Sequence, residues 1–364
     1  MSMQKPGRKP IAVASGILVI AMGLIGCGGA GSDGVGGTAD PGKAPGIALL
    51  FPGTQTARNQ ALDIPVFEAK IKTLGDFEVV ASDAGKDASA QVKQAQSALA
   101  DGAGVLVLDP VDAKATDEIV AAAAEKDVPV ISYDSLGSGN PGLAFRISFD
   151  HEQIGVLQAN SLVQKLRSDG VANPGILMVN GPAGDPEAEL LAKGAHSVID
   201  KSSVKILAGL DAADWNPGQV QDWTAKRILG FPGRIDGIYA AKDSLSAGAI
   251  AALTAAEVKP WPTVTGQDAD LEAIRRIITG RQYMSIYKPV RAEAELAAGV
   301  AAKLARGQAP PTATKIGGVP TRLLIPKVVT RGNIMGTVIS DGVYTVEEIC
   351  TADYAKACAA ANIK

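Results

Sequence analysis

Short apolar runs alternate with longer amphipathic stretches from residue 46 onward. In the first cycle, an apolar run at residues 47–51 precedes a helical stretch at residues 58–74. A short, continuously apolar run is typical of a strand buried on both faces, whereas apolar residues spaced three and four apart predict a helix. The same criteria predict strands at residues 77–81, 104–108, 128–132, 175–179, 204–207, 235–239, 263–265 and 283–287, and helices at residues 88–100, 113–126, 154–167, 187–201, 218–229, 245–256, 271–279 and 291–306.

This alternation runs through two successive arrays, and the second array begins near residue 150. Strands that alternate with helices form parallel sheets with helices on both faces. The sequence therefore predicts an α/β fold with two Rossmann-like, doubly wound parallel-sheet lobes. Sheets of this kind bind ligands outside the carboxyl ends of their strands, so the binding site is expected among residues that follow strands.

The composition excludes several classes of function. The 364 residues contain 35 Lys and Arg against 38 Asp and Glu, a net charge of −3, and no nucleic-acid-binding signature is present. A nucleic-acid ligand is therefore not expected. The chain also lacks the GxSxG, HExxH, GxxxxGK[ST] and GxGxxG motifs of common enzymes. We expect a binding protein that is not an enzyme and that needs neither cofactor nor metal.

The N-terminus has the order of charge and apolarity found in exported proteins. Residues 1–26 contain three basic residues followed by an apolar run at residues 11–25, which is short for a membrane span. This run ends in Leu-Ile-Gly-Cys, which resembles the lipobox of bacterial lipoproteins. The resemblance implies cleavage before Cys27, acylation of Cys27 and a flexible Gly-rich tether at residues 27–45. The alternative is an uncleaved signal anchor in which Cys27 is incidental.

Two further cysteines, Cys350 and Cys358, lie in the C-terminal extension at residues 346–364. If Cys27 carries lipid, they remain as a pair in an oxidising compartment, where a disulfide is expected. Eight residues on one straight helix rise about 12 Å, too far for a disulfide. A bond therefore requires a turn between the two cysteines, and the alternative is two buried free thiols.

Charged residues gather where the predicted strands end. Each carboxylate taken alone could be a helix cap or a turn residue. Taken together they predict one polar rim, because carboxylates and cationic donors bind sugar hydroxyls and an aromatic face packs the apolar face of a sugar. The residues of this rim are Arg58, Asp134, Asp150, Trp215, Asp243, Asp268 and Lys288.

Six segments resemble the D-xylose-binding family of periplasmic sugar-binding proteins: residues 56–58, 133–134, 147–150, 266–270 (GQDAD), 287–289 (YKP) and 319–324. The resemblance implies two lobes that close on a sugar, three crossing segments near Phe149, Lys288 and Pro326, and ligand contacts from the seven rim residues. It implies a first lobe of residues 46–149 plus 289–320 and a second lobe of residues 150–288 plus 321–345.

Several positions depart from the family pattern. Asn59 replaces an aromatic residue, His151 and Lys242 each replace an asparagine, and Ser135 replaces an arginine. We include Asn59, His151 and Lys242 among the candidate ligand contacts. These changes suggest either a ligand other than xylose, such as one with an acidic group, or a pocket that has drifted and still binds a neutral sugar.

The sequence therefore predicts an extracytoplasmic, lipid-anchored solute-binding protein. We expect a monomer that captures a small polar ligand, a sugar, and delivers it to the permease and ATPase of an ABC importer. One alternative is a lipoprotein that presents the ligand to a signalling receptor, and a weaker one is an enzyme on the same fold. A sugar-responsive repressor is disfavoured by the signal peptide and by the lack of a DNA-binding head.

Overall fold

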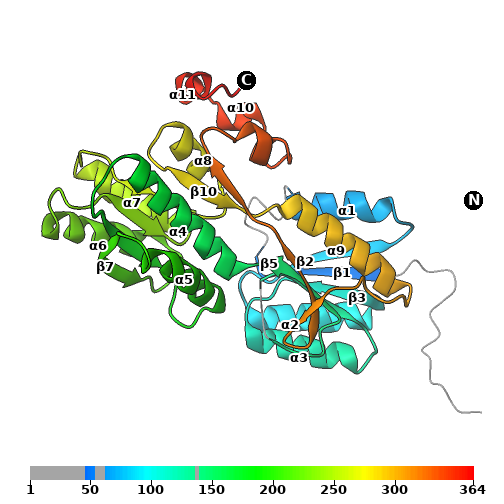
Figure 1. Cartoon of the computed structure of the whole chain (residues 1–364). Helices are drawn as coiled ribbons and strands as arrows, with labels where there is room; N and C mark the ends of the chain where they lie inside the picture. The colour runs from blue at the N-terminus through cyan, green and yellow to red at the C-terminus, as the bar shows by residue number, and fades with distance from the viewer. Residues whose placement is uncertain (1–45, 54–61, 136–138) are drawn as a thin grey trace, which may run out of the picture. The chain divides into compact units, whose positions relative to one another are not determined.

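The computed structural model describes residues 46–53, 62–135 and 139–364 (Figure 1). The predicted signal peptide, tether and lipidation site Cys27 lie outside the described residues, as do Arg58 and Asn59. Within the described part of the chain, no helix is both long enough and apolar enough to span a membrane.

The first lobe is built on a sheet of seven strands in the order β11-β12-β5-β4-β3-β1-β2. Its strands are β1 (Gly46–Phe51), β2 (Glu78–Asp83), β3 (Ala103–Leu108), β4 (Val130–Asp134), β5 (Phe145–Phe149), β11 (Thr314–Ile316) and β12 (Val319–Leu324), and its helices are α1 (Ile64–Lys72), α2 (Ala88–Ala100), α3 (Ala113–Ala124) and α9 (Val290–Ala305). All neighbouring strands are parallel except β11 and β12.

Strand β1 shows why the first sheet is covered on both faces. Ile47, Leu49 and Phe51 belong to a core shared with α1 and α9. Ala48 and Leu50 belong to a separate core shared with α2 and α3. Since successive side chains of a strand point to opposite faces, helices lie on both sides of the sheet, as Figure 1 shows. The predicted doubly wound arrangement is confirmed for this lobe.

The second lobe contains a parallel sheet in the order β7-β6-β8-β9 and an antiparallel pair, β10-β13. Its strands are β6 (Gly175–Asn180), β7 (Lys205–Asp211), β8 (Gly237–Ala240), β9 (Thr263–Val264), β10 (Met284–Tyr287) and β13 (Lys327–Thr330), and its helices are α4 (His151–Ser168), α5 (Pro186–Ile199), α6 (Pro217–Gly230), α7 (Asp243–Ala255) and α8 (Leu271–Ile278). A parallel bridge between Gln267 and Ile286 connects the segment after β9 to β10.

Three segments carry the chain between the two lobes. The first joins β5 to α4 at Asp150, the second joins β10 to α9 at Lys288, and the third joins β12 to β13 at residues 325–326. The predicted number of crossings is confirmed. The expected lobe boundary at residues 320–321 is wrong, because residues 321–324 continue β12 and pair with β5 in the first sheet.

The C-terminal segment contains a π-helix (Met335–Ile339) and the short helices α10 (Val346–Ile349) and α11 (Ala355–Ala360). Cys358 and Ile363 bury their side chains against Ile274 and Ile277 of α8. A disulfide joins Cys350 to Cys358, whose Cα atoms lie 5.9 Å apart. A turn at residues 352–354 separates the two helices, which supplies the reversal that the pairing requires.

Candidate functional site

Lys288 connects the strand ends of the two lobes. It follows β10, and its ammonium nitrogen lies 3.1 Å from Oδ1 of Asp134 at the end of β4 and 3.8 Å from Oδ1 of Asp268 after β9. The same nitrogen lies 5.5 Å from the centre of the Phe149 ring. The Lys288 side chain is 8% exposed and that of Asp268 is 37% exposed. The structure thus brings together three of the predicted rim residues, and Asp268 reaches solvent.

Asp134 is fixed by contacts that the sequence analysis missed. Its backbone has a left-handed φ of 55°, which turns the chain sharply at the end of β4. Its N–H donates to Oε1 of Glu293 at 3.1 Å, and its carbonyl accepts a hydrogen bond from the Ser148 hydroxyl. Glu293 is fully buried in the first turn of α9. The sequence did contain a sign of this role: Glu293 is a charged residue on the apolar face of a predicted helix, where charged residues are rare unless they have a partner.

Asp268 is held in the loop that follows β9. Its φ is 97°, and its N–H donates to the Ile286 carbonyl at 2.8 Å. Withdrawal from water raises the pKa of Asp268, but the positive charges of Lys242 and Lys288, together with the hydrogen bond from Gln267, lower the pKa overall. Asp268 is therefore a charged acceptor at neutral pH, suited to bind hydroxyl groups.

Asp243 does not lie on the rim surface. Its side chain is buried, and Oδ1 accepts a hydrogen bond from Nε2 of Gln282 at 2.6 Å. Oδ2 accepts from the Ser285 hydroxyl at 2.8 Å and from the Asp270 N–H at 3.2 Å. Burial, followed by the charge of Asp270, raises its pKa well above the usual range. The predicted direct ligand contact is corrected: Asp243 positions the loop that carries Asp268.

Trp215 and Lys242 form a second part of the rim. The Trp215 indole N–H donates to Oδ2 of Asp185 at 3.3 Å, and the Lys242 ammonium lies 4.2 Å from the centre of the indole ring. The six-membered ring lies against Gly181, where an added Cβ would be 2.6 Å from Cζ2 and closer still to Cη2. Gly181 therefore leaves the room that the indole occupies. The Trp215 side chain is only partly buried, as expected for a rim residue.

Asp150 and His151 begin α4. Oδ1 of Asp150 accepts a hydrogen bond from the Gln153 N–H at 2.9 Å, so the simple interpretation of Asp150 as a helix cap applies. The His151 side chain is fully buried, and its Nε2 lies 3.7 Å from Oε1 of Glu187. Within the described residues, neither ring nitrogen has a hydrogen-bond partner. Burial is the main reason that the pKa of His151 is lowered, so the ring is neutral at pH 7.

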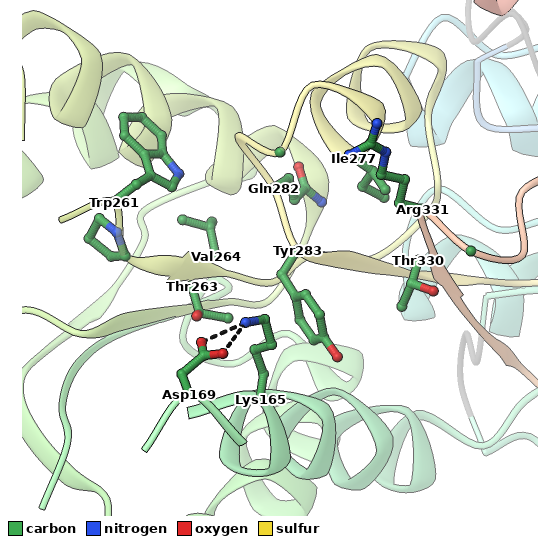
Figure 2. A pocket seen from close by; sticks show the side chains of 13 residues that line it. Lys165, Asp169, Trp261, Thr263, Val264, Ile277, Gln282, Tyr283, Thr330 and Arg331 are labelled. Atoms are coloured by element: carbon green, nitrogen blue, oxygen red, sulfur yellow. Dashed lines mark hydrogen bonds and ion pairs between the residues drawn. The ribbon is translucent and has the colours of Figure 1, made fainter. Parts of the chain in front are cut away.

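A cavity of about 490 Å³ lies elsewhere in the second lobe, at the amino ends of β9 and β10 (Figure 2). Tyr283 and Trp261 line it, together with the ion pair of Lys165 and Asp169. Asp268 and Lys288 follow the opposite ends of the same strands. This cavity is therefore distinct from the predicted rim. Among the described residues, no group of three or more His, Cys, Asp or Glu side chains could hold a metal ion.

Two wound lobes joined by three crossings, with charged side chains at their strand ends, define the class of two-lobed ligand-binding proteins. The profile of the family described as "Periplasmic binding protein domain" matches residues 47–309. The chain belongs to this family.

Individual relatives agree with this assignment. The chain is 32% identical to the D-xylose-binding periplasmic protein of Escherichia coli (strain K12) over 295 residues, which cover 79% of this chain and 87% of that protein. It is 30% identical, with the same coverage, to the D-xylose-binding periplasmic protein of Haemophilus influenzae. The crystal structure of an ABC transporter solute binding protein from Clostridium phytofermentans with bound β-D-glucose superimposes with a TM-score of 0.73 at 26% identity, covering 84% of this chain and 99% of that chain.

The predicted resemblance to the D-xylose-binding family is thereby confirmed. These relatives are named as binding proteins, which supports a binding protein in place of an enzyme.

Proposed function

We propose that this chain is a lipid-anchored, extracytoplasmic solute-binding protein that captures a sugar and delivers it to an ABC importer. The names of the relatives support a sugar as the ligand. The lipid anchor rests on the Leu-Ile-Gly-Cys segment ending at Cys27, and the importer rests on the family of the relatives.

The arrangement of Asp134, Lys288 and Asp268 is the observation that carries this proposal. Asp134 belongs to the first lobe and Asp268 to the second, and Lys288 lies on the crossing between them. Carboxylates accept hydrogen bonds from vicinal hydroxyls, and an ammonium group donates them. A polyol that bonds to both carboxylates contacts both lobes at once. Such a ligand stabilises a closed arrangement by its greater affinity for that state.

Binding of candidate ligands to the mature chain tests the proposal. Thermal shift over pentoses, hexoses, sugar acids and polyols should identify a stabilising ligand, since saturation at 100 times Kd adds about 2.7 kcal/mol. Isothermal titration should then give a Kd that Asp268→Ala weakens by roughly 10- to 150-fold, because a hydrogen bond to a charged group contributes about 1.5–3 kcal/mol.

Two lysine variants make the test specific. Lys288→Ala should weaken binding by a similar factor, since it removes the cation between Asp134 and Asp268. Lys327→Ala is the matched control, because Lys327 is also near a crossing but pairs with Asp341 and is 44% exposed. If the Lys288 variant remains folded and binds a confirmed sugar as tightly as the control, the binding site lies elsewhere. If no sugar or polyol binds to the wild type, the proposed function is refuted.

A further inference from the structure

Lys242 is a cation of the rim without a carboxylate partner in the described part of the chain. No carboxylate oxygen of residues 46–53, 62–135 or 139–364 lies within 4.0 Å of its ammonium group, which instead lies over the Trp215 ring. The nearby acids have other partners: Asp268 lies next to Lys288, Glu187 faces His151, and Asp185 accepts from the Trp215 N–H. Lys242 acts on Asp268 only at longer range, where it lowers the pKa of that carboxyl.

The position of Lys242 in the fold makes this charge unusual. It is the N-cap of α7 and makes no side-chain capping hydrogen bond. The N-caps of five other helices are Asp or Asn residues whose side chains accept backbone N–H bonds, namely Asp87, Asp112, Asp150, Asp185 and Asn216. The amino end of a helix carries a partial positive charge that favours anions and disfavours a lysine. Lys242 therefore adds its charge to an end that already attracts anions.

His151 supplies an independent observation at the same place. It is fully buried, and both its ring nitrogens lack hydrogen-bond partners in the described structure. The charged groups that face it are Glu187 from α5, Lys288 from the crossing, Asp134 from β4 and Lys242 before α7. A buried imidazole whose ring nitrogens make no hydrogen bonds costs free energy unless a ligand or water completes those bonds. The ring therefore lies among the charges of the rim, with two ring nitrogens whose hydrogen-bonding capacity is unused in the described structure.

We propose that the preferred ligand is a sugar acid, a polyhydroxylated molecule with one carboxylate that pairs with Lys242 at the amino end of α7. This inference rests on the proposed function, because the hydroxyl groups bind at Asp134 and Asp268. The one negative charge of a sugar acid matches the one positive charge of Lys242, which has no carboxylate partner among the described residues. The surrounding carboxylates of Asp134, Asp268 and Asp185 would repel a dianion such as a sugar phosphate.

Titration of matched pairs of neutral and acidic sugars tests the inference: D-glucose with D-glucuronate, D-galactose with D-galacturonate, and D-xylose with D-xylonate. For at least one pair, the wild type should bind the acid about tenfold more tightly or better, the effect of one charge-assisted hydrogen bond. Lys242→Gln should remove this preference. It should weaken binding of the acid about tenfold and change the affinity for the neutral sugar little.

Three controls accompany this titration. Lys226→Gln removes an exposed lysine on α6 in the same lobe, and it should leave the preference intact. Lys242→Arg keeps the positive charge and should still bind the acid more tightly than the neutral sugar. Acid binding should also strengthen as the pH falls from 8 to 6, because a bound anion favours protonated His151, and His151→Asn should flatten this dependence.

The outcomes separate the inference from the proposed function. A wild type that binds neutral sugars as tightly as their acids overturns the inference and leaves the proposed function standing. The same holds if a folded Lys242→Gln variant keeps the acid preference. A wild type that binds neither member of any pair, nor any other sugar or polyol, refutes the proposed function and the inference together.

Discussion

Replacing Gly194 by alanine should force apart the two helices that begin at the candidate site. Gly155 of α4 and Gly194 of α5 face each other across a close helix contact. A Cβ added at Gly194 would lie 2.9 Å from the Glu152 carbonyl carbon and 3.0 Å from the Val156 amide nitrogen, and closer still to the Glu152 oxygen. These are backbone atoms, so no rotamer change relieves the clash, and the helices themselves must move.

The size of the effect follows from two opposing contributions. Overpacking a well-packed contact costs about 1–3 kcal/mol, and a backbone clash belongs in the upper part of that range. Replacing glycine by alanine inside a helix returns about 0.5–1 kcal/mol. The net loss in the free energy of unfolding should therefore be about 1–2 kcal/mol. This corresponds to a melting temperature lower by about 2–4 °C for each kcal/mol.

Urea and thermal unfolding of purified Gly194→Ala would measure this loss. Gly299 provides the matched control, because it lies inside helix α9 and an added Cβ would meet no described atom within 4 Å beyond its own stretch of helix. Gly299→Ala should stabilise the protein by about 0.5–1 kcal/mol. If the two variants unfold at the same urea concentration, the inferred close packing of α4 on α5 is wrong.

The remaining predictions concern attachment, the disulfide and lobe closure. Cys27→Ala should move the protein from the membrane fraction to the soluble fraction, and equal partitioning of the variant and the wild type would contradict lipid anchoring. Intact-mass analysis of the mature chain should find no alkylatable thiol before reduction. The double variant Cys350→Ser/Cys358→Ser should lower the free energy of unfolding by about 2–3 kcal/mol, because its unfolded chain is less restricted. Small-angle scattering should show a smaller radius of gyration when a confirmed ligand is added, whereas an unchanged radius would indicate a pocket confined to one lobe.

Most of the fold could be predicted because buried parallel strands are continuously apolar. Strands such as β3 and helices such as α2 appear at the predicted residues. The apolar pattern does not predict strand β5, because Arg146 and Ser148 interrupt it. Both side chains are nevertheless buried in the first sheet. Strand β12 contains a proline and an arginine, and its pairing with β5 joins residues more than 170 positions apart. Pairing over such a distance cannot be deduced from a local pattern.

The candidate site could be predicted only as a set of strand ends. Residues that follow strands meet at one edge of a parallel sheet, which correctly brought Asp134, Asp268 and Lys288 together. The same rule does not say which way a side chain points. Asp243 turns inward because Gln282 and Ser285, about 40 residues later, offer hydrogen-bond donors inside the lobe. These partners are set by tertiary packing, and only the structure shows them.

Asp270 should make the stability of the second lobe depend on pH. It is the N-cap of α8 but makes no side-chain capping hydrogen bond. Partial enclosure raises its pKa to about 6, and the charges of Asp268 and Glu272 add to this effect against the opposing charge of Arg276. The folded state therefore binds a proton more tightly than the unfolded state, and stability from this group is lost as the pH rises from about 4 through 6.

Asp270→Asn should remove this pH-dependent loss of stability, because asparagine does not ionise. The urea midpoint of the variant should exceed that of the wild type at pH 8, where Asp270 is ionised, and the two midpoints should converge at pH 4.5. Asp76→Asn, an exposed carboxylate near β2, controls for the removal of one negative charge. The urea midpoints of Asp270→Asn and the wild type could instead differ by the same amount at both pH values. That result would mean that the ionised Asp270 carboxylate is not destabilised by its neighbours. The loop that presents Asp268 would then be held by its hydrogen bonds to Asp243 and Ser285, without stored repulsion between its carboxylates.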